Sequence, residues 1–303
     1  MKLNLHNGSL ILLITISCIA GCKKEYTANQ TTPPSGGNPP SGGTVQQDTT
    51  FTAPVIPYPT SPALGCNYAP DYGDSIVYTQ PTTGSDYFVF PRNNQGIKGT
   101  YMSWPQGLVM NSATGAVDLS QSDKGERYSV GFVKEGSSDT CLSQLIVGGV
   151  AYMDSVYVLS MSDTTSRPYY DANPFTPTPC GSSSGPGPGC QFDYNGYAQN
   201  QGIAVDSKTG FIDLKKTMAN HPFGLLLLNG ASVTTSIYYK LNDQSNYAPQ
   251  MIQLKLMYYN HKSDIPSSLL GTITTNLINT LTNLLISKGP SARPPLIIIV
   301  RDN

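Results

Sequence analysis

Two aspartates are the first candidates for chemistry, because each stands at the same place in a stretch that the chain contains twice. Residues 107–119 read GLVMNSATGAVDL and residues 202–214 read GIAVDSKTGFIDL, with Asp118 and Asp213 next to the end. Two carboxylates in different environments can act as the acid and base of a glycosidase, or they can bind a metal ion. Because these two belong to different repeat units, we expect solvated carboxylates on strands, with a shared site between the units as the alternative.

Other acids lie in segments expected to be loops, and they are candidate ligands for calcium. The chain lacks the DxDxDG pattern of calcium-binding loops, so solvated turn acids are the favoured interpretation. We therefore predict no metal site and no cofactor. The acids in question are Asp71, Asp74, Asp123 and Glu126.

Histidine is a common general base, and only His221 and His261 remain if the first residues are removed as a targeting signal. No GxSxG nucleophile elbow, with a strand before it and a helix after it, frames a serine; the string GSSSG at residues 181–185 lies in the segment rich in Pro, Gly and Ser. His221 precedes a proline in an expected turn, and His261 lies beside Lys262 where a strand gives way to a helix. Both are predicted to be surface residues. A protein without catalysis is favoured, and a hydrolase acting on glycan or peptide is the alternative.

Three pairs of adjacent tyrosines are the candidate ligand-binding residues. Neighbouring residues of a β-strand point to opposite faces of the sheet, so one ring of each pair is expected to reach the surface. An exposed ring can stack on a sugar or a peptide. Ordinary strand composition is the competing interpretation. The pairs are Tyr169 with Tyr170, Tyr238 with Tyr239, and Tyr258 with Tyr259.

The N-terminus has the features of a bacterial lipoprotein signal. Lys2 supplies a basic start, residues 10–19 form an apolar run too short to span a bilayer, and residues 19–22 read IAGC. This ending resembles the lipobox, in which the cysteine is acylated and becomes the first residue; an ordinary signal peptide is the alternative. The resemblance implies a signal peptide over residues 1–21, a lipid of the palmitate kind on Cys22, and a protein anchored in the cell outer membrane, on its periplasmic or its outer side.

Composition excludes one class of partner and points to a tether. Asp, Glu, Lys and Arg make up 12% of the 303 residues and the net charge is −1, which excludes the basic surface of a nucleic-acid-binding protein. Residues 22–62 are rich in Thr, Pro, Gly and Ser with few apolar side chains to bury, so we predict a disordered tether. The expected partners are the membrane, through the lipid, and a glycan or another envelope protein.

Four cysteines follow Cys22. An even set in an oxidising compartment favours disulfides, and four cysteines allow three pairings. We favour Cys66 with Cys141, and Cys180 with Cys190, the second closing the loop CGSSSGPGPGC. A metal site is disfavoured because no histidine lies near them in sequence and no CxxC occurs.

The repeated stretch predicts a β-hairpin in each copy. Asn111 and Asp206 can accept hydrogen bonds from nearby backbone N–H groups, and Gly115 and Gly210 can take the positive φ that closes such turns. Many further short strands separated by turn residues, such as residues 126–133 with their alternating apolar side chains, predict a mainly β protein.

One segment near the C-terminus changes from a strand period to a helix period. Apolar residues recur every three or four positions between Pro266 and Gly289, which predicts a helix over about residues 266–288. Its other face carries Thr and Asn, so docking of the apolar stripe on the sandwich must stabilise it; a partner or membrane helix is the alternative. Residues 296–300, LIIIV, are expected to form a strand in the interior of a sheet.

The repeated stretch, followed in its first copy by Ser122, Gly125 and YSV at residues 128–130, resembles the immunoglobulin-like repeats of the cadherin-like superfamily. The resemblance covers residues 99–133 and, more weakly, residues 201–217, where no Gly-x-x-Tyr-x-Val follows. It implies two tandem immunoglobulin-like β-sandwich units that act as spacers or adhesive modules, and it brings no catalytic residues.

These observations predict the organisation of the whole chain. A first sandwich is expected at residues 63–163, a linker rich in Pro, Gly and Ser at 164–189, and a second unit at 190–303 that contains the helix before its last strand. Cys190 lies close before the second motif, so the second unit is expected to lack the opening strands of the first. The function expected of such a chain is binding, adhesion or structural support in the cell envelope.

Overall fold

The computed structural model describes residues 58–59, 66–180, 189–282 and 294–302. Backbone contacts divide the chain into Met1–Pro40 and Ser41–Asn303, and every described residue belongs to the second part. The predicted signal peptide, Cys22 and nearly all of the tether predicted at residues 22–62 lie outside the described residues. So does the predicted helix beyond residue 282.

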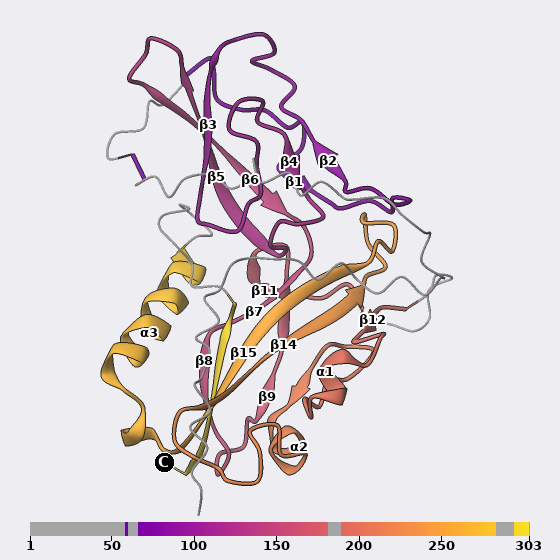
Figure 1. Ribbon diagram of the computed structural model, residues 1–303, viewed down its shortest axis with the longest axis vertical. Helices are drawn as coiled ribbons and strands as arrows, with labels where there is room; N and C mark the ends of the chain where they lie inside the picture. Colours follow the sequence, from indigo (N-terminus) through magenta and orange to yellow (C-terminus); the bar gives the residue numbers. More distant parts are fainter. Residues whose placement is uncertain (1–57, 60–65, 181–188, 283–293, 303) are drawn as a thin grey trace, which may run out of the picture. The chain divides into compact units, whose positions relative to one another are not determined.

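The described residues form a mainly β structure, as the composition predicts (Figure 1). The first strands are β1 (Ile76–Val77), β2 (Phe88–Val89), β3 (Gly99–Trp104), β4 (Val117–Asp118), β5 (Glu126–Lys134) and β6 (Thr140–Val147). The next are β7 (Val150–Tyr152), β8 (Ser155–Val158), β9 (Thr165–Ser166), β10 (Pro168–Tyr170), β11 (Asn173–Pro177) and β12 (Gln191–Phe192). The remaining elements are α1 (Tyr197–Asn200), β13 (Ile212–Asp213), α2 (Leu214–Ala219), β14 (Ala231–Lys240), β15 (Gln250–His261), the 3-10 helix η2 (Lys262–Asp264), α3 (Ser267–Thr282) and β16 (Leu296–Asp302).

The first sheet has the strand order β1-β6-β5-β3. Strand β1 runs parallel to β6, and the other neighbours are antiparallel. Strands β2 and β4 pair antiparallel in a separate two-stranded sheet. The alternating apolar residues of β5, Tyr128, Val130 and Phe132, are fully buried and share one apolar cluster with Met110 and Leu119 of the first motif. The repeated stretch therefore supplies part of the core of the first sheet.

The second sheet has the strand order β12-β14-β15-β16-β8. Strands β12, β14 and β15 pair antiparallel, whereas β16 is parallel to β15 and β8 is parallel to β16. A parallel pair needs a crossover connection, and α3 lies in the connection between β15 and β16. Residues 296–300 are buried in the interior of the sheet, as predicted. The parallel pairs distinguish this sheet from an all-antiparallel sandwich.

The same pairings occur twice along the chain. Strands β3, β5 and β6 are neighbours in the first sheet, as β12, β14 and β15 are in the second. The second strand of each motif hairpin also pairs antiparallel with an earlier strand. Strand β4 pairs with β2, and β13 pairs with β9. Strands β8 and β9, at residues 155–166, therefore provide opening strands that the second unit was expected to lack. Strands β9, β10 and β11 fall inside the segment predicted as a linker, and the division at residues 163 and 190 stays a prediction.

Each repeated stretch folds into the predicted hairpin and closes with the same hydrogen bond. The N–H of Gly115 donates to the carbonyl of Asn111 at 2.8 Å, and the N–H of Gly210 donates to the carbonyl of Asp206 at 2.9 Å. Both glycines have the expected positive φ, 72° and 74°. The turn residues therefore act as the sequence predicts.

An aromatic ring covers each of these glycines. A Cβ at Gly115 would lie 2.7 Å from the ring of Tyr101, and a Cβ at Gly210 would lie 2.6 Å from the ring of Phe192. Tyr101 belongs to β3 and Phe192 to β12, which occupy equivalent places in the two sheets. Glycine is required at both positions because of its backbone angle and because of the ring above it.

A tyrosine hydroxyl binds the carbonyl of the same glycine in both hairpins. The hydroxyl of Tyr72 donates to Gly115 at 2.7 Å, and the hydroxyl of Tyr152 donates to Gly210. Both tyrosines are buried. Each turn is thus held by a ring on one side and by a buried hydrogen bond on another.

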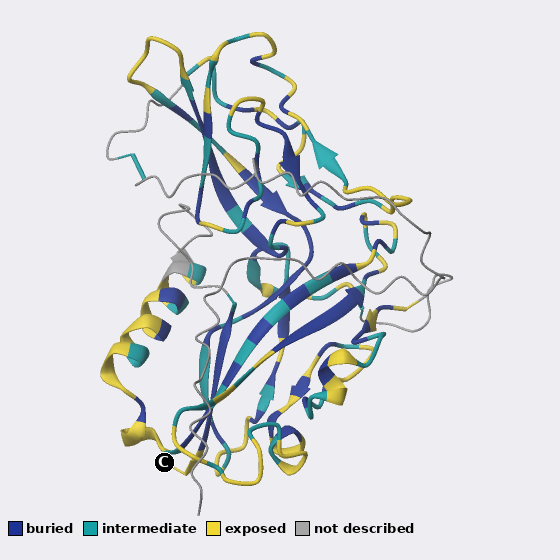
Figure 2. Ribbon diagram, in the orientation of Figure 1, coloured by how far each residue is buried: buried dark blue, intermediate teal, exposed yellow. Residues whose placement is uncertain are grey.

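Helix α3 begins after Pro266, as predicted, and its buried residues lie on the side that faces the second sheet (Figure 2). Leu269, Leu270 and Ile273 contact the apolar cluster that includes Val300 of β16. Docking on its own sheet is therefore the correct interpretation for this part of the helix. Leu281, further along the same stripe, is 38% exposed, so the stripe is buried less completely toward the end. None of the helices within the described ranges is long and apolar enough to cross a membrane.

Two disulfides, Cys66–Cys141 and Cys180–Cys190, join the cysteine pairs favoured from the sequence. Their Cα atoms are 5.4 Å and 5.3 Å apart, and the paired cysteines are separated by 75 and 10 residues respectively. The first disulfide connects the segment before β1 to β6. The second closes the chain around residues 181–188, which lie outside the described residues.

Alanine at Gly115 or Gly210 is expected to destabilise the protein more than alanine at Gly136. All three glycines have positive φ, but a Cβ at Gly136 meets no atom within 4 Å. Positive φ costs an alanine roughly 1–2 kcal/mol, and a collision with a packed ring adds roughly 1–3 kcal/mol. Unfolding in urea measures the three losses. Equal losses would contradict the role given to Tyr101 and Phe192.

Removing the disulfide with the longer loop is expected to cost more stability than removing the other. A cross-link over 75 residues restricts the unfolded chain more than one over 10, and the chain-entropy relation gives roughly 4.5 and 2.7 kcal/mol. Thermal unfolding of the double variant Cys66→Ala/Cys141→Ala is compared with that of Cys180→Ala/Cys190→Ala. A larger loss from the second variant would contradict this account.

Candidate functional site

The acid of each motif holds the turn that follows it. Oδ1 of Asp118 accepts the N–H groups of Ser120 at 2.9 Å and Gln121 at 3.1 Å. Oδ1 of Asp213 accepts the N–H of Lys216 at 2.9 Å and so caps helix α2. The two acids lie on β4 and β13, in different sheets. The prediction of a solvated carboxylate is right for exposed Asp213 and wrong for Asp118, which is only 4% exposed because the motif packs into the core.

Asp118 lies near a second carboxylate, that of exposed Asp86. Burial and then the charge of Asp86 raise the pKa of Asp118 to about 6, although the N–H groups of Gln121 and Ser120 lower it. The side chain of Gln121 donates to both oxygens of Asp86, at 3.4 and 3.3 Å. Asp118 therefore changes its protonation state in weakly acidic solution.

A buried lysine completes this group. Lys124 is 6% exposed, and its Nζ donates to the carbonyl of Ser120 at 2.7 Å. Burial lowers the pKa of Lys124 to about 8, while the carboxylates of Asp123, Asp118 and Asp86 raise it. The amine and the Asp118 carboxylate both bind backbone atoms of the turn that follows β4. Their chemistry fits positioning of this turn, with protonation changes near neutral pH.

The loop acids named as possible calcium ligands do not form a cluster. Within the described part of the chain, no three His, Cys, Asp or Glu side chains are grouped so that they could hold a metal ion. Asp71 accepts the N–H two residues further on at 2.7 Å, and Asp74 is exposed. Glu126 is buried and accepts the hydroxyl of Tyr169 at 3.4 Å.

Burial removes most of the predicted tyrosine surface. Five of the six rings are 5% exposed or less: Tyr169, Tyr238, Tyr239, Tyr258 and Tyr259. Only Tyr170 is partly exposed. The expectation that one ring of each pair reaches the surface is wrong for the other two pairs. Tyr239 and Tyr259 belong to apolar clusters on one face of their strands. Tyr238 packs against the rings of Tyr194 and Tyr197, and Tyr258 packs against that of Phe223, so the second ring of each pair is covered as well.

Tyr170 belongs instead to a polar network that the sequence did not indicate. Its hydroxyl donates to Oδ2 of Asp243 at 2.8 Å and lies 3.4 Å from the hydroxyl of Tyr78, which donates to Oδ2 of Asp171 at 2.6 Å. Oδ1 of Asp171 accepts the N–H of Gly149 at 3.0 Å. Burial raises the pKa of Asp171, and these donors lower it.

The members of this network are far apart in sequence, and no spacing in a single chain connects them. Tyr78 follows β1, Tyr170 and Asp171 lie at the turn between β10 and β11, and Asp243 follows β14. Asp171 and the next residue both have positive φ without being glycine, which no turn pattern in the sequence signals. The two carboxylates accept hydrogen bonds from the tyrosine hydroxyls and so can hold these three segments together. The arrangement therefore supports a structural role.

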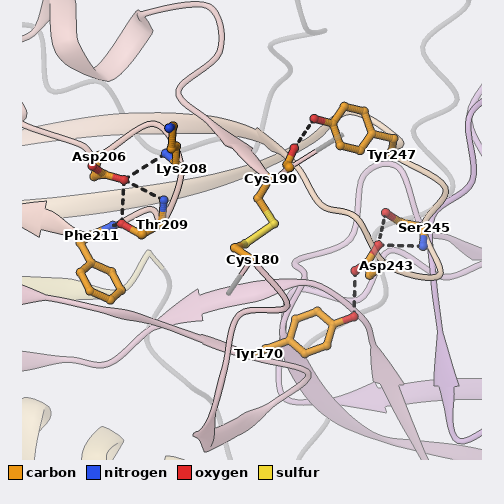
Figure 3. The surroundings of a disulfide bond; sticks show 11 residues. Tyr170, Cys180, Cys190, Asp206, Lys208, Thr209, Phe211, Asp243, Ser245 and Tyr247 are labelled. Atoms are coloured by element: carbon orange, nitrogen blue, oxygen red, sulfur yellow. Dashed lines mark hydrogen bonds between the residues drawn. A yellow bond between two sulfur atoms is a disulfide. The ribbon is translucent and has the colours of Figure 1, made fainter. Parts of the chain in front are cut away.

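The second disulfide lies in the same surroundings as this network and the second motif turn (Figure 3). The hydroxyl of Tyr247 donates to the carbonyl of Gly189, beside Cys190. In the motif turn, Oδ1 of Asp206 accepts the N–H groups of Lys208 at 3.0 Å and Thr209 at 2.8 Å. The polar side chains shown with the disulfide are thus used for local turns and loop anchors.

Both histidines are exposed, as predicted. His221 has a φ of 54° and lies in the turn after α2, where its carbonyl accepts the N–H of Gly224 at 3.0 Å. His261 ends β15, and its N–H donates to the carboxylate of Asp264 at 3.1 Å. These contacts give both histidines a place in turns at the surface.

Comparisons with known proteins identify no family for this chain. No family model matches it, and no curated protein matches it. Among solved structures, it is similar to a cadherin fragment, the crystal structure of human CDH23 EC21-23, with 14% identity and a TM-score of 0.17. The similarity covers 62% of this chain and 63% of that chain. A TM-score this low does not establish a shared fold.

Replacing Asp118 by asparagine is expected to remove a loss of stability that the parent shows as the pH rises. The folded pKa of about 6 exceeds the ordinary value of 3.8, so the folded state holds the proton more tightly and stability falls between these two pH values. The variant is expected to match the parent near pH 4. Near pH 7 it should be more stable by on the order of 1 kcal/mol, after allowance for solvent screening. Urea unfolding across this range measures the difference.

Asp206→Asn provides a control of opposite sign. Hydrogen bonds from the N–H and hydroxyl of Thr209 lower the pKa of Asp206, so its contribution to stability is present at neutral pH and is lost as the pH falls through the folded pKa. This variant is expected to be less stable than the parent near pH 7 and to approach it in acid. If the free energy of unfolding of Asp118→Asn changes with pH as that of the parent does between pH 4 and 7, the raised pKa of Asp118 is contradicted.

Proposed function

We propose that this chain is a lipid-anchored, extracytoplasmic protein of the cell envelope whose folded part serves binding, adhesion or structural support. In this proposal Cys22 carries the lipid, and residues 22–62 connect it to the folded part. The location is the outer membrane, on its periplasmic or its outer side. A glycan or another envelope protein is the proposed partner.

The observation that carries the proposal is the pair of disulfides. Cys66–Cys141 and Cys180–Cys190 use every cysteine that follows Cys22. Disulfides persist in oxidising compartments and are rare where thiols are kept reduced. The lipobox-like residues 19–22 supply independent support from the other end of the chain.

We propose further that the two sets of pairings are two immunoglobulin-like sandwiches of the cadherin-like kind. Support comes from the antiparallel neighbours β3, β5 and β6 with β1 added parallel at the edge, and from the separate pair β2–β4. The second set repeats this plan, with β16 placed between β15 and β8. On this interpretation, α3 and β16 are an insertion into the second sandwich.

The use of the motif acids favours a binding or structural role over hydrolysis. Hydrolysis of a glycan needs two carboxylates that face the same bond from a short distance. Asp118 and Asp213 instead accept backbone N–H groups of the turns that follow them, and they lie in different sheets. A repeat that contributes turns and core residues is the expected feature of a spacer or adhesive module.

Metabolic labelling with an alkyne analogue of palmitate tests the anchor. The parent chain is expected to take up the label, and Cys22→Ser is expected to lose it completely, because the proposed acylation is on that cysteine. Cys18→Ser is the matched control, since this cysteine lies four residues earlier in the predicted signal peptide. In-gel fluorescence of the purified chain measures the label. Equal labelling of the parent and Cys22→Ser, or no labelling of the parent, would exclude Cys22 as the anchor.

A further inference from the structure

An apolar loop between α2 and β14 exposes three leucines to solvent. Residues 221–230, here called the leucine loop, read HPFGLLLLNG and contain no Asp, Glu, Lys or Arg. Leu225, Leu226 and Leu228 are 87%, 79% and 66% exposed. Three exposed leucines within one short loop mark a site of interaction more often than an isolated exposed leucine does.

The base of the leucine loop is anchored to the end of the second sheet. Oδ1 of Asn229 accepts the N–H of Asn260 at 2.7 Å, and its Nδ2 donates to Asp264 at 3.0 Å. The ring of Phe223 packs against that of Tyr258, with centroids 6.0 Å apart. Because both ends of the loop are bound, the leucines are presented outward by an anchored loop.

The residue types favour a lipid surface over a protein partner. Leucine is under-represented among the residues that dominate protein–protein interfaces, whereas it is among the side chains that enter a bilayer most favourably. Insertion into a bilayer would desolvate the loop without burying a charged side chain, because the loop contains no Asp, Glu, Lys or Arg. Just before it, α2 presents exposed Lys215 and Lys216, which can contact anionic headgroups. Asp213 at the start of α2 is engaged as the helix cap.

A second copy of this chain fits the leucine loop less well. Three leucine side chains offer a few hundred square ångströms, against roughly 800 Å² per partner in a standard interface. An open hollow of about 350 Å³ beside β3 and β5 is lined by Lys98, Thr100, Lys134 and Glu135, which are not suited to receive leucines. This hollow is therefore a poor receptor for the leucine loop of a second copy.

We propose that the leucine loop inserts into the interface of the bilayer to which the chain is anchored. This inference rests on the proposed lipid anchor, which would keep the folded part near a membrane. Residues 22–57 can span at most about 130 Å when fully extended, so the loop stays at high effective concentration near the same bilayer. Insertion of the loop fixes which face of the folded part meets the membrane and leaves the other faces for a partner.

Vesicle binding of the chain without its lipid tests the leucine loop directly. The mature chain that begins at residue 22 and carries Cys22→Ser, here called the Cys22→Ser chain, lacks the apolar signal segment of residues 10–19. It is mixed with vesicles of phosphatidylethanolamine and phosphatidylglycerol, and its partition is measured by co-sedimentation. Each inserted leucine is worth on the order of tenfold in partition. The added changes Leu225→Gln, Leu226→Gln and Leu228→Gln are together expected to lower the partition coefficient at least tenfold.

Two exposed phenylalanines provide the matched control. Phe90 and Phe175 are 60% and 74% exposed, so Phe90→Gln with Phe175→Gln removes apolar surface elsewhere. This control is expected to bind vesicles as the Cys22→Ser chain does. Since all the changed side chains are exposed, each variant should keep the thermal unfolding midpoint of its parent. A second readout is Leu226→Trp, whose fluorescence brominated lipids should quench, whereas that of Phe175→Trp should stay unquenched.

The outcomes separate this inference from the proposed anchor. Failure of the Cys22→Ser chain to bind vesicles, or equal binding by the leucine variant, overturns the loop proposal and leaves the palmitate result unaffected. Self-association of the parent that the leucine variant loses, without vesicle binding, also overturns it and assigns the loop to a second copy. Loss of vesicle binding only when the loop is altered, together with quenching of the Leu226→Trp variant alone, supports insertion, whatever lipid Cys22 carries.

Discussion

The structure depends on a glycine that must take positive φ beneath an aromatic ring, and the chain meets this requirement twice. Gly115 lies under Tyr101 and Gly210 under Phe192, each at the turn of a hairpin that delivers apolar residues to a core. A buried tyrosine hydroxyl then binds the glycine carbonyl. The repeated sequence is therefore best explained by packing: its polar residues close the turn, and its acid fixes the segment that follows. The residue types that the two copies have in common can therefore be explained without a ligand that both copies bind.

The second half differs from the first through one crossover, and a buried carboxylate accounts for part of its stability. Asp154, just before β8, accepts the N–H of Leu296 at 2.7 Å and the side-chain amide of Asn276 at 2.6 Å. Burial raises the pKa of Asp154, and these two donors lower it. The acid thus joins the start of β16 to helix α3, and it explains a buried asparagine in a helix that otherwise docks through apolar side chains. Removal of either partner would leave a buried polar group unpaired.

Local features were predictable from sequence, and features set by distant contacts were not. The positive φ of Gly115 and Gly210, the helix start after Pro266 and the burial of residues 296–300 follow from turn chemistry and periodicity, because each depends on neighbouring residues. The cysteine pairs follow from their number and spacing only as one choice among three. Strand alternation failed for Tyr238 and Tyr258, since it cannot tell whether both faces of a strand are covered. The network of Tyr78, Tyr170, Asp171 and Asp243 could not be found, because it brings together residues that no local pattern relates.

Hydrogen exchange at the two hairpins tests most directly whether the repeated stretch is a pair of equivalent structural turns. The amides of Asn111, Gly115 and Asp118 are hydrogen-bonded in the first hairpin, and those of Asp206, Gly210 and Asp213 make the same bonds in the second. We predict that both sets exchange as slowly as the amides of the neighbouring sheets, because a ring and a buried hydroxyl hold each turn. Exchange of either set at the rate of an exposed turn such as residues 135–138 would contradict the account.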